Sequence, residues 1–284
     1  MTLAPGRFDY APINDRPVIR WPNNARVAFW VAPNMEFFEY LPENRPTQPD
    51  IPHYSRMDYG NRVGFWRMLE VFDDFGMPAV LAINGSAIAR YGAIVRAARE
   101  RRWEFIGHGF SQKNMQKVAD ERADIRKTAA AIREVTGANP RGWLGPGLTE
   151  TWETPDLLAE EGYEYVCDWV LDDEPVVLKT RAKPIVNIPY TQECNDVAMM
   201  LIQHHPAREY YDRAIDQFEQ LYEDARESAR VMALVVHPYI MGAPHRARYF
   251  GDVLEAICER DGVLFWTGAA ILDWYSAQTP GRVG

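Results

Sequence analysis

The chain has 284 residues, of which 47% are hydrophobic and 25% are charged. A chain of this length and composition folds as a globular protein with a large core. Its 31 Lys and Arg residues against 40 Asp and Glu residues give a net charge of −9. With no run of basic residues, this balance argues against nucleic acid and anionic membranes as partners. The three cysteines form no CxxC pair, so their spacing indicates neither a zinc ribbon nor a redox pair.

The amino terminus shows no basic start followed by an apolar stretch, and so gives no sign of a signal peptide. No segment approaches the ~18 consecutive apolar residues that a membrane span needs. We therefore expect a cytoplasmic protein. A cytoplasmic location favours a small-molecule substrate over an external polymer.

Apolar runs that end at Gly, Pro, Asn or His predict strands along most of the chain. The predicted strands cover residues 26–32, 78–83, 103–107, 141–144, 163–166, 231–236 and 263–266. Segments with a 3.6-residue apolar period predict helices over 62–75, 86–101, 118–135, 210–227 and 247–260, with others opening at Thr154 and ending near Tyr275. Residues 37–57, rich in proline and aromatic side chains, are predicted to form an ordered loop near a pocket.

The regular alternation of strands and helices is typical of parallel βαβ units. About seven such units without an internal linker favour a barrel over an open sheet. Extended pieces at 176–178 and 185–188 predict a short β-rich insertion, which makes closure of the barrel incomplete. We therefore expect an α/β fold with an irregular lead-in at residues 1–25 and a single barrel domain at 26–284.

Polar side chains follow most of the predicted strands at the point where each strand ends. They are Asn34 and Glu36, Asn84, His108, Gly145-Pro146, Asp168-Trp169, Tyr190 and His237. Glycines on both sides of His108 allow a sharp turn that leaves its imidazole uncovered. Because the carboxyl ends of parallel strands meet on one face, which carries the active site in barrel enzymes, we expect these residues to share a site.

Such a group of residues supports hydrolysis. Glu36 can act as a base on water or bind a metal, and a histidine can donate a proton to a leaving nitrogen. Other chemistries lack their motifs. The sequence contains no Gly-x-Ser-x-Gly elbow, no phosphate loop and no Gly-x-Gly-x-x-Gly opening a helix.

The ordered set of motifs resembles the polysaccharide deacetylase superfamily, known as carbohydrate esterase family 4 or by its NodB homology. Within it, the chain is most similar to the branch of metal-independent allantoinases and cyclic-imide hydrolases. The motifs are Asn34-Met35-Glu36, residues 58–64, His108, residues 141–146, Asp168-Trp169, residues 188–190, Asn195-Asp196 and His237-Pro238. The resemblance implies a distorted, incompletely closed (β/α)7-type barrel and a homo-oligomer.

The chain departs from the metal-dependent members at two positions. Sugar deacetylases of the superfamily carry an Asp-Asp or Asp-x-Asp first motif and two histidines spaced H-x3-H or H-x4-H. Here Asn34 and Glu36 form the first motif, and Gln112 stands four residues after His108. One His and one Glu hold zinc poorly. We therefore predict no firmly bound cofactor and no metal ligands, with a divalent metal such as zinc as a weakly supported alternative.

The resemblance assigns the catalytic roles to Glu36, His108 and His237, and leaves open which of the three is the base. The predicted substrate-binding residues are Asn34, Tyr59, Arg62, Trp143, Gly145, Pro146, Asp168 and Trp169, and the resemblance places the segment with Tyr59 and Arg62 beside the substrate. The residues themselves also allow Tyr59 and Arg62 to be helix-entry packing, and Trp143 and Trp169 to belong to the core.

Three functions remain open at this point. The first is hydrolysis of a carbon–nitrogen bond in a small, cyclic amide such as a ureide, imide or lactam. The second is metal-dependent N-deacetylation of an acetylated sugar. The third is a binding module that keeps the barrel but has no activity. The sequence alone does not name the substrate.

Overall fold

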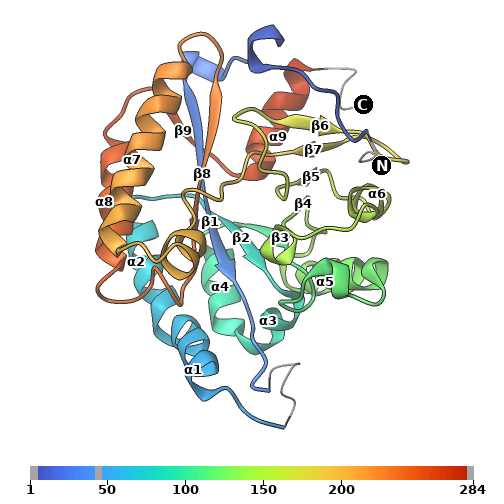
Figure 1. Ribbon diagram of the computed structural model, residues 1–284, viewed down its shortest axis with the longest axis vertical. Coiled ribbons are helices and arrows are strands. Elements are labelled where there is room, and N and C mark those ends of the chain that lie inside the picture. Colours follow the sequence, from blue (N-terminus) through green and yellow to red (C-terminus); the bar gives the residue numbers. More distant parts are fainter. Residues whose placement is uncertain (1–5, 42–46, 280–284) are drawn as a thin grey trace.

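The computed structural model describes residues 6–41 and 47–279 (Figure 1). Residues 1–5 of the expected lead-in, 42–46 of the expected loop and 280–284 at the carboxyl end lie outside the described residues. The described chain forms one curled sheet with helices packed around it (Figure 1). This arrangement confirms the predicted α/β fold and the incompletely closed barrel.

The strands of the sheet lie in the order β6-β7-β5-β4-β3-β2-β1-β8, and β9 also pairs with β1. All pairs are parallel except β6 with β7. The bounds are β1 Val27–Met35, β2 Val80–Ile83, β3 Glu104–Gly107, β4 Gly142–Trp143, β5 Tyr165–Val166, β6 Val176–Leu178, β7 Ile185–Asn187, β8 Arg230–Val236 and β9 Val263–Phe265. The antiparallel β6-β7 hairpin is the predicted β-rich insertion, and it ends the sheet at one edge.

The α-helices alternate with the strands as predicted, but several bounds differ. They are α1 Ile51–Tyr59, α2 Phe65–Asp74, α3 Gly85–Arg90, α4 Gly92–Glu100, α5 Glu121–Thr136, α6 Thr154–Glu160, α7 Ala207–Asp224, α8 Ala247–Cys258 and α9 Gly268–Gln278. Helix α5 ends at Gly137, whose φ of 83° is the left-handed conformation that favours glycine at a helix end.

Three predicted boundaries were wrong. Strand β1 continues through Pro33 to Met35, because β8 and β2 extend the pairing past the proline. The predicted helix 86–101 is two helices that break at Tyr91, whose ψ of 47° is not helical. The expected loop 37–57 already becomes helical at Ile51, and α1 runs through a π-helical segment at Gly60–Gly64 into α2.

Strand β1 shows how the core is divided. Val27, Phe29 and Val31 pack with the helices that cover the outside of the sheet. Their neighbours Ala28, Trp30 and Ala32 point to the other face, where they meet side chains of the other strands and of α9. Side chains on both faces of β1 are fully buried, as expected for a parallel strand covered on both sides.

Residues 6–25 pack against the barrel, although none of them belongs to a strand. Arg7 forms a buried ion pair with Asp156 on α6, with Nη2 and Oδ2 2.6 Å apart. Trp21 is buried and donates its indole N–H to the carbonyl of Arg230 over 3.0 Å. These contacts bind the predicted lead-in to the domain.

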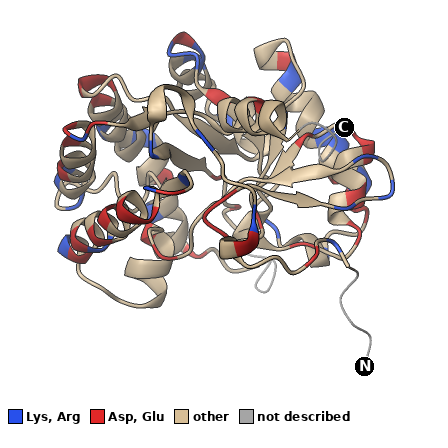
Figure 2. Ribbon diagram, turned by 90° about the horizontal axis from the view of Figure 1, so that it is seen from above, with Lys and Arg blue, Asp and Glu red and all other residues tan. Residues whose placement is uncertain are grey.

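Figure 2 shows basic and acidic residues interspersed along the helices around the sheet. Among the described residues, no helix combines the length and the apolar character needed to cross a membrane.

Candidate active site

The predicted catalytic residues meet at the carboxyl edge of the parallel strands. Glu36 follows β1, His108 follows β3 and His237 follows β8. The exposed fraction of each is 6% or less. The strand ends therefore bring together three residues that lie 72 and 129 positions apart in the chain, as the difference between their numbers shows.

The carboxylate of Glu36 lies at the centre of the group. Its Oε1 is 3.4 Å from Nε2 of His108 and 3.6 Å from Nε2 of His237. Gln112 makes the third contact with this oxygen, because its Nε2 donates a hydrogen bond to Oε1 over 2.6 Å. Oε2 is buried and has no hydrogen-bond partner among the described residues. One oxygen is thus held in place while the other stays available.

The orientation of Gln112 is fixed by backbone groups through Asn84. Asn84 accepts the N–H of Phe37 at Oδ1 and donates from Nδ2 to the carbonyl of His108. With its amide oriented in this way, Asn84 Nδ2 also donates to Gln112 Oε1 over 2.9 Å. The amino group of Gln112 must then face Glu36. A reversed amide would place two donors or two acceptors against each other.

His237 is held by a buried carboxylate on its far side. Its Nδ1 lies 2.6 Å from Oδ1 of Asp196, and its backbone N–H donates to Oδ2 of the same residue over 2.7 Å. Asp196 is fully buried. Asp196, His237 and Glu36 therefore form a line in which one imidazole lies between two carboxylates.

This arrangement favours an ionised pair. Burial opposes the charge on Glu36, but the charge and hydrogen bonds of His237 and His108 lower its pKa to about 2. Burial likewise opposes the charge on His237, but Asp196 and Glu36 raise its pKa to about 10. At neutral pH, Glu36 is a carboxylate and His237 an imidazolium.

His108 has a different environment. Its Nδ1 lies 2.7 Å from the carbonyl oxygen of Leu144. A carbonyl can only accept, so Nδ1 carries a proton and donates it. Nε2 faces Glu36 Oε1 over 3.4 Å, so the protonated ring donates to this oxygen, whereas the neutral ring has a lone pair at Nε2 that can take a proton. His108 is thereby placed to accept a proton, whereas His237 is placed to donate one.

The three residues open into a cavity of about 180 Å³. Asn34 and Gly145, both predicted to bind substrate, lie in its wall, as do Tyr190 and Tyr239. Asn34 donates to the hydroxyl of Tyr190 over 3.0 Å, while its Oδ1 has no partner among the described residues. Asn34 and Glu36 each present one free buried oxygen to a ligand in this cavity.

Two predicted substrate-binding residues lie elsewhere. Arg62 is largely exposed, pairs with Asp58 and lines a separate cavity beside α3. The Tyr59 hydroxyl accepts from Arg67 over 3.3 Å and does not line the cavity at Glu36. Tyr59 and Arg62 lie away from the site because α1 continues through Gly60–Gly64 into α2. This helix turns a different face to the site.

The face of this helix that meets the site is built from small residues. A Cβ added to Gly60 would overlap the backbone of Tyr239, and one added to Gly64 would overlap the carbonyl of Pro238. Between them, Asn61 donates to the backbone carbonyl of Glu36 over 3.1 Å. The segment 58–64 therefore supports the site through its glycines and Asn61.

Trp143 and Pro146 also differ from the prediction. Trp143 is fully buried and packs edge-to-face on Tyr163, with ring centroids 5.6 Å apart. It belongs to the core, because β4 points this side chain away from the cavity. Pro146 is buried against Gly109, whose φ is 67°. It supports the turn after His108 and does not line the cavity.

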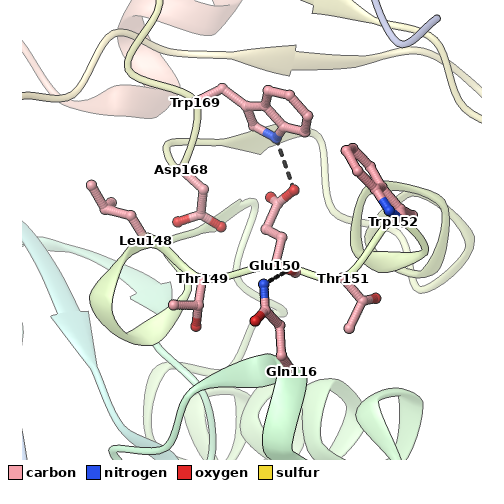
Figure 3. A pocket seen from close by; sticks show the side chains of 8 residues that line it. All are labelled: Gln116, Leu148, Thr149, Glu150, Thr151, Trp152, Asp168 and Trp169. Carbon is pink, nitrogen blue, oxygen red and sulfur yellow. Dashed lines mark hydrogen bonds between the residues drawn. The ribbon is translucent and has the colours of Figure 1, made fainter. Parts of the chain in front are cut away.

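The last two predicted residues, Asp168 and Trp169, line a second cavity of about 580 Å³ (Figure 3). This cavity adjoins the first, since Leu148 lines both. Asp168 Oδ1 accepts the backbone N–H of Gly145 over 2.6 Å. This N–H is therefore already bound and is not free to stabilise an oxyanion.

The residues at Glu36 do not fit a divalent metal ion well. Among the described residues, no group of three or more His, Cys, Asp and Glu side chains is arranged to hold one. The N–H of Gln112 occupies Oε1, the Glu36 oxygen that lies nearest both histidines.

Sequence reasoning did not assign three residues that the structure brings to this site. Gln112 was noticed only as a departure from the family, although its spacing from His108 was the signal. Asp196 lay in a quoted motif, but nothing in its spacing showed that it would pair with His237. Tyr239, two residues after His237, gave no signal, because its place depends on the contact with Gly60.

The chain resembles known proteins in sequence and in fold. Residues 47–166 match the family model described as polysaccharide deacetylase. The resemblance to polysaccharide deacetylases identified from the motifs is therefore confirmed.

The similarity extends beyond the matched segment. A Schizosaccharomyces pombe protein named "Putative polysaccharide deacetylase" is 27% identical, with 95% of each chain covered. Among solved structures, a probable polysaccharide deacetylase from Pseudomonas aeruginosa is 25% identical with a TM-score of 0.86, covering 94% of this chain and 96% of that one. PuuE allantoinase has a TM-score of 0.84 at 24% identity, covering 96% and 99%. These similarities show that the deacetylase-type fold extends over nearly the whole chain.

Proposed function

We propose that this polysaccharide deacetylase homologue hydrolyses a carbon–nitrogen bond in a small, cyclic amide, using its own side chains to activate water. The observation that carries the proposal is the Glu36 carboxylate between a proton-accepting His108 and a protonated His237. Gln112, where metal-dependent members place a histidine, donates to this carboxylate.

The first step is attack by water. A water molecule beside Glu36 and His108 donates one hydrogen to the carboxylate and the other to Nε2 of His108. A carboxylate whose pKa is about 2 is a weak base, so Glu36 orients the water while His108 takes the proton. The hydroxide equivalent then adds to the carbonyl carbon of the amide.

The second step is departure of the nitrogen. The imidazolium of His237 stabilises the oxyanion that forms, and the proton collected by His108 passes to the leaving nitrogen. The nitrogen of an imide or ureide leaves more readily than an amine, because the second carbonyl stabilises its negative charge. A cyclic imide or ureide therefore suits this site, because its nitrogen needs less help from an acid to leave.

The size of the cavity supports a small substrate. A space of about 180 Å³ accommodates one ring more readily than a segment of polymer. The free oxygens of Asn34 and Glu36 can accept N–H groups of such a ring. The fold shared with PuuE allantoinase is compatible with this choice, which rests on the cavity and its donors and acceptors.

The test is mass spectrometry of the products formed from cyclic amides and N-acetylated sugars. The proposal predicts ring opening to a carboxylate with gain of one water, and no acetate. Glu36→Gln serves as the inactive control. Acetate release from the sugars, with every ring left intact, would establish the deacetylase alternative instead.

Two further predictions concern the protein as a whole. We propose that it forms a homo-oligomer and acts in the cytoplasm on a small molecule. Light scattering of the purified chain tests the first, and fractionation of the native cells tests the second.

A further inference from the structure

The cavity beside the active site contains one buried and one partly buried carboxyl group. Asp168 is 8% exposed, and Glu150 comes from the loop after β4. Figure 3 shows both carboxyl groups directed into the space enclosed by Leu148, Trp152 and Trp169. The indole N–H of Trp169 donates to Glu150 Oε2 over 2.8 Å.

One oxygen of each carboxyl group lacks a donor. No N–H or O–H of another described residue reaches Glu150 Oε1 or Asp168 Oδ2. Burial and mutual repulsion raise the pKa of Glu150, and burial raises that of Asp168 to about 6. The two oxygens without donors are free to accept hydrogen bonds from a ligand. Ionisation of either group places a negative charge in the cavity.

Nothing in the described chain neutralises that charge directly. No Lys, Arg or His forms an ion pair with either carboxyl group among residues 6–41 and 47–279. Arg7 lies on this side of the domain, but its guanidinium binds Asp156 and the backbone oxygens of Trp152 and Lys179. A buried negative charge without a partner is unfavourable, and a bound cation would relieve it.

We propose that this second cavity is a binding site for a ligand group with a single positive charge, such as a guanidinium or an ammonium. A guanidinium or an ammonium carries the N–H donors that Glu150 Oε1 and Asp168 Oδ2 lack, together with a positive charge. The indoles of Trp169 and of the half-exposed Trp152 flank the cavity, and aromatic faces attract cations. A volume of about 580 Å³ is ample for a small organic cation.

This proposal concerns binding alone, so it does not depend on the reaction proposed above. The cation can be an arm of the substrate that occupies both cavities, or a separate small molecule. Leu148, which lines both cavities, marks the passage that such an arm would follow.

The experiment compares two probes of the same shape, n-butylguanidinium and n-butylurea, by calorimetric titration of the full chain at matched ionic strength. We expect the guanidinium to bind at least tenfold more tightly than the urea. Glu150→Gln, which keeps an acceptor for Trp169, should weaken guanidinium binding at least tenfold. Glu153→Gln is the matched control, since Glu153 is exposed and pairs with Arg181 outside the cavity.

Equal affinity for the two probes, or unchanged guanidinium binding in Glu150→Gln, would overturn the proposal. If Glu150→Gln does not fold, Asp168→Asn carries the same test, because its amide oxygen can still accept from Gly145. The source of the cation follows from kinetics on cyclic amides with and without a guanidinium arm. A lower KM for the armed ring, lost in Glu150→Gln, identifies the arm; an equal KM identifies a separate molecule.

Discussion

Glu36 and Glu150 are carboxyl groups on loops at the same edge of the sheet, after β1 and β4, yet their pKa values shift in opposite directions. Glu36 faces His237 and His108, which lower its pKa to about 2 in spite of burial. Glu150 faces Asp168, and burial together with that second carboxyl raises its pKa. Burial is common to both, so the partner decides the charge. The first arrangement is a charged catalytic group, whereas the second leaves a charge to be matched by a ligand.

The largest expected effect comes from removing the proton acceptor of the first arrangement. His108→Asn keeps a donor for the carbonyl of Leu144 but has no nitrogen at the position of Nε2. We expect kcat to fall by about 10²–10⁴-fold with little change in melting temperature. Steady-state kinetics and thermal unfolding measure the two quantities. A variant that retains most of its kcat would exclude His108 as the base.

The free energy of unfolding tests the contrast between Glu36 and Glu150. Glu36→Gln leaves the His237 imidazolium beside a neutral amide, and we expect a loss of about 3 kcal/mol in the free energy of unfolding. Glu150→Gln removes a carboxyl group whose ionisation is opposed by burial and by Asp168, and we expect a change within about 1 kcal/mol or a gain. Urea unfolding at pH 7 measures both. Equal losses in the two variants would refute the contrast.

The same contrast predicts that the contributions of Glu36 and Glu150 to stability depend on pH in opposite ways. The folded pKa of Glu36 is lowered from 4.5 to about 2, so its contribution to stability is present above pH 4.5 and lost as the pH falls towards 2. The folded pKa of Glu150 is raised above 4.5, so its contribution is greatest below pH 4.5 and lost as the pH rises through the folded pKa. The two Gln variants should each remove one of these slopes.

A smaller change tests the partner of His237. Asp196 raises the pKa of His237 to about 10, and His237 must be protonated to act. Asp196→Asn lowers that pKa, so the alkaline limb of kcat should move from about pH 10 to a value lower by roughly one to three pH units. The pH profile separates this effect from a general loss of structure. A reduced kcat with an unmoved limb would mean that Asp196 only supports the fold.

The smallest expected effect concerns the amide that holds Glu36. Gln112→Ala removes one hydrogen bond to a charged oxygen, which corresponds to a roughly tenfold loss of kcat/KM. Gln112→Glu is the sharper companion, because it places a second carboxyl against Glu36 and should cost more. If Gln112→Ala is as active as the wild type, the orientation of Glu36 does not depend on this contact.

The sequence predicted the fold well because the strands and helices have clear local patterns. It placed Glu36, His108 and His237 correctly for the same reason, since each directly follows a strand and parallel strands end on one face. Tyr59 and Arg62 were misplaced because their orientation depends on a helix that continues through Gly60 and Gly64. That continuity arises from packing against the loop after β8, which no local pattern reveals.

The charge states of the site residues could not be predicted from the sequence, because they also depend on contacts between distant segments. From its residue type and its position after a strand, Glu36 is a candidate base or metal ligand. Its low pKa results from His237, which is itself charged because of Asp196, and these residues lie on separate strand ends. The pairing of Glu150 with Asp168 likewise joins two loops, so only the three-dimensional arrangement shows it.

The central claim is that side chains alone activate the water. It is tested most directly by measuring turnover of a cyclic amide before and after exhaustive chelation, with elemental analysis of the same samples. The account predicts that kcat stays within about twofold of the untreated value when the metal content falls below a tenth of an ion per chain. Loss of activity on chelation, restored by one equivalent of zinc, would contradict it.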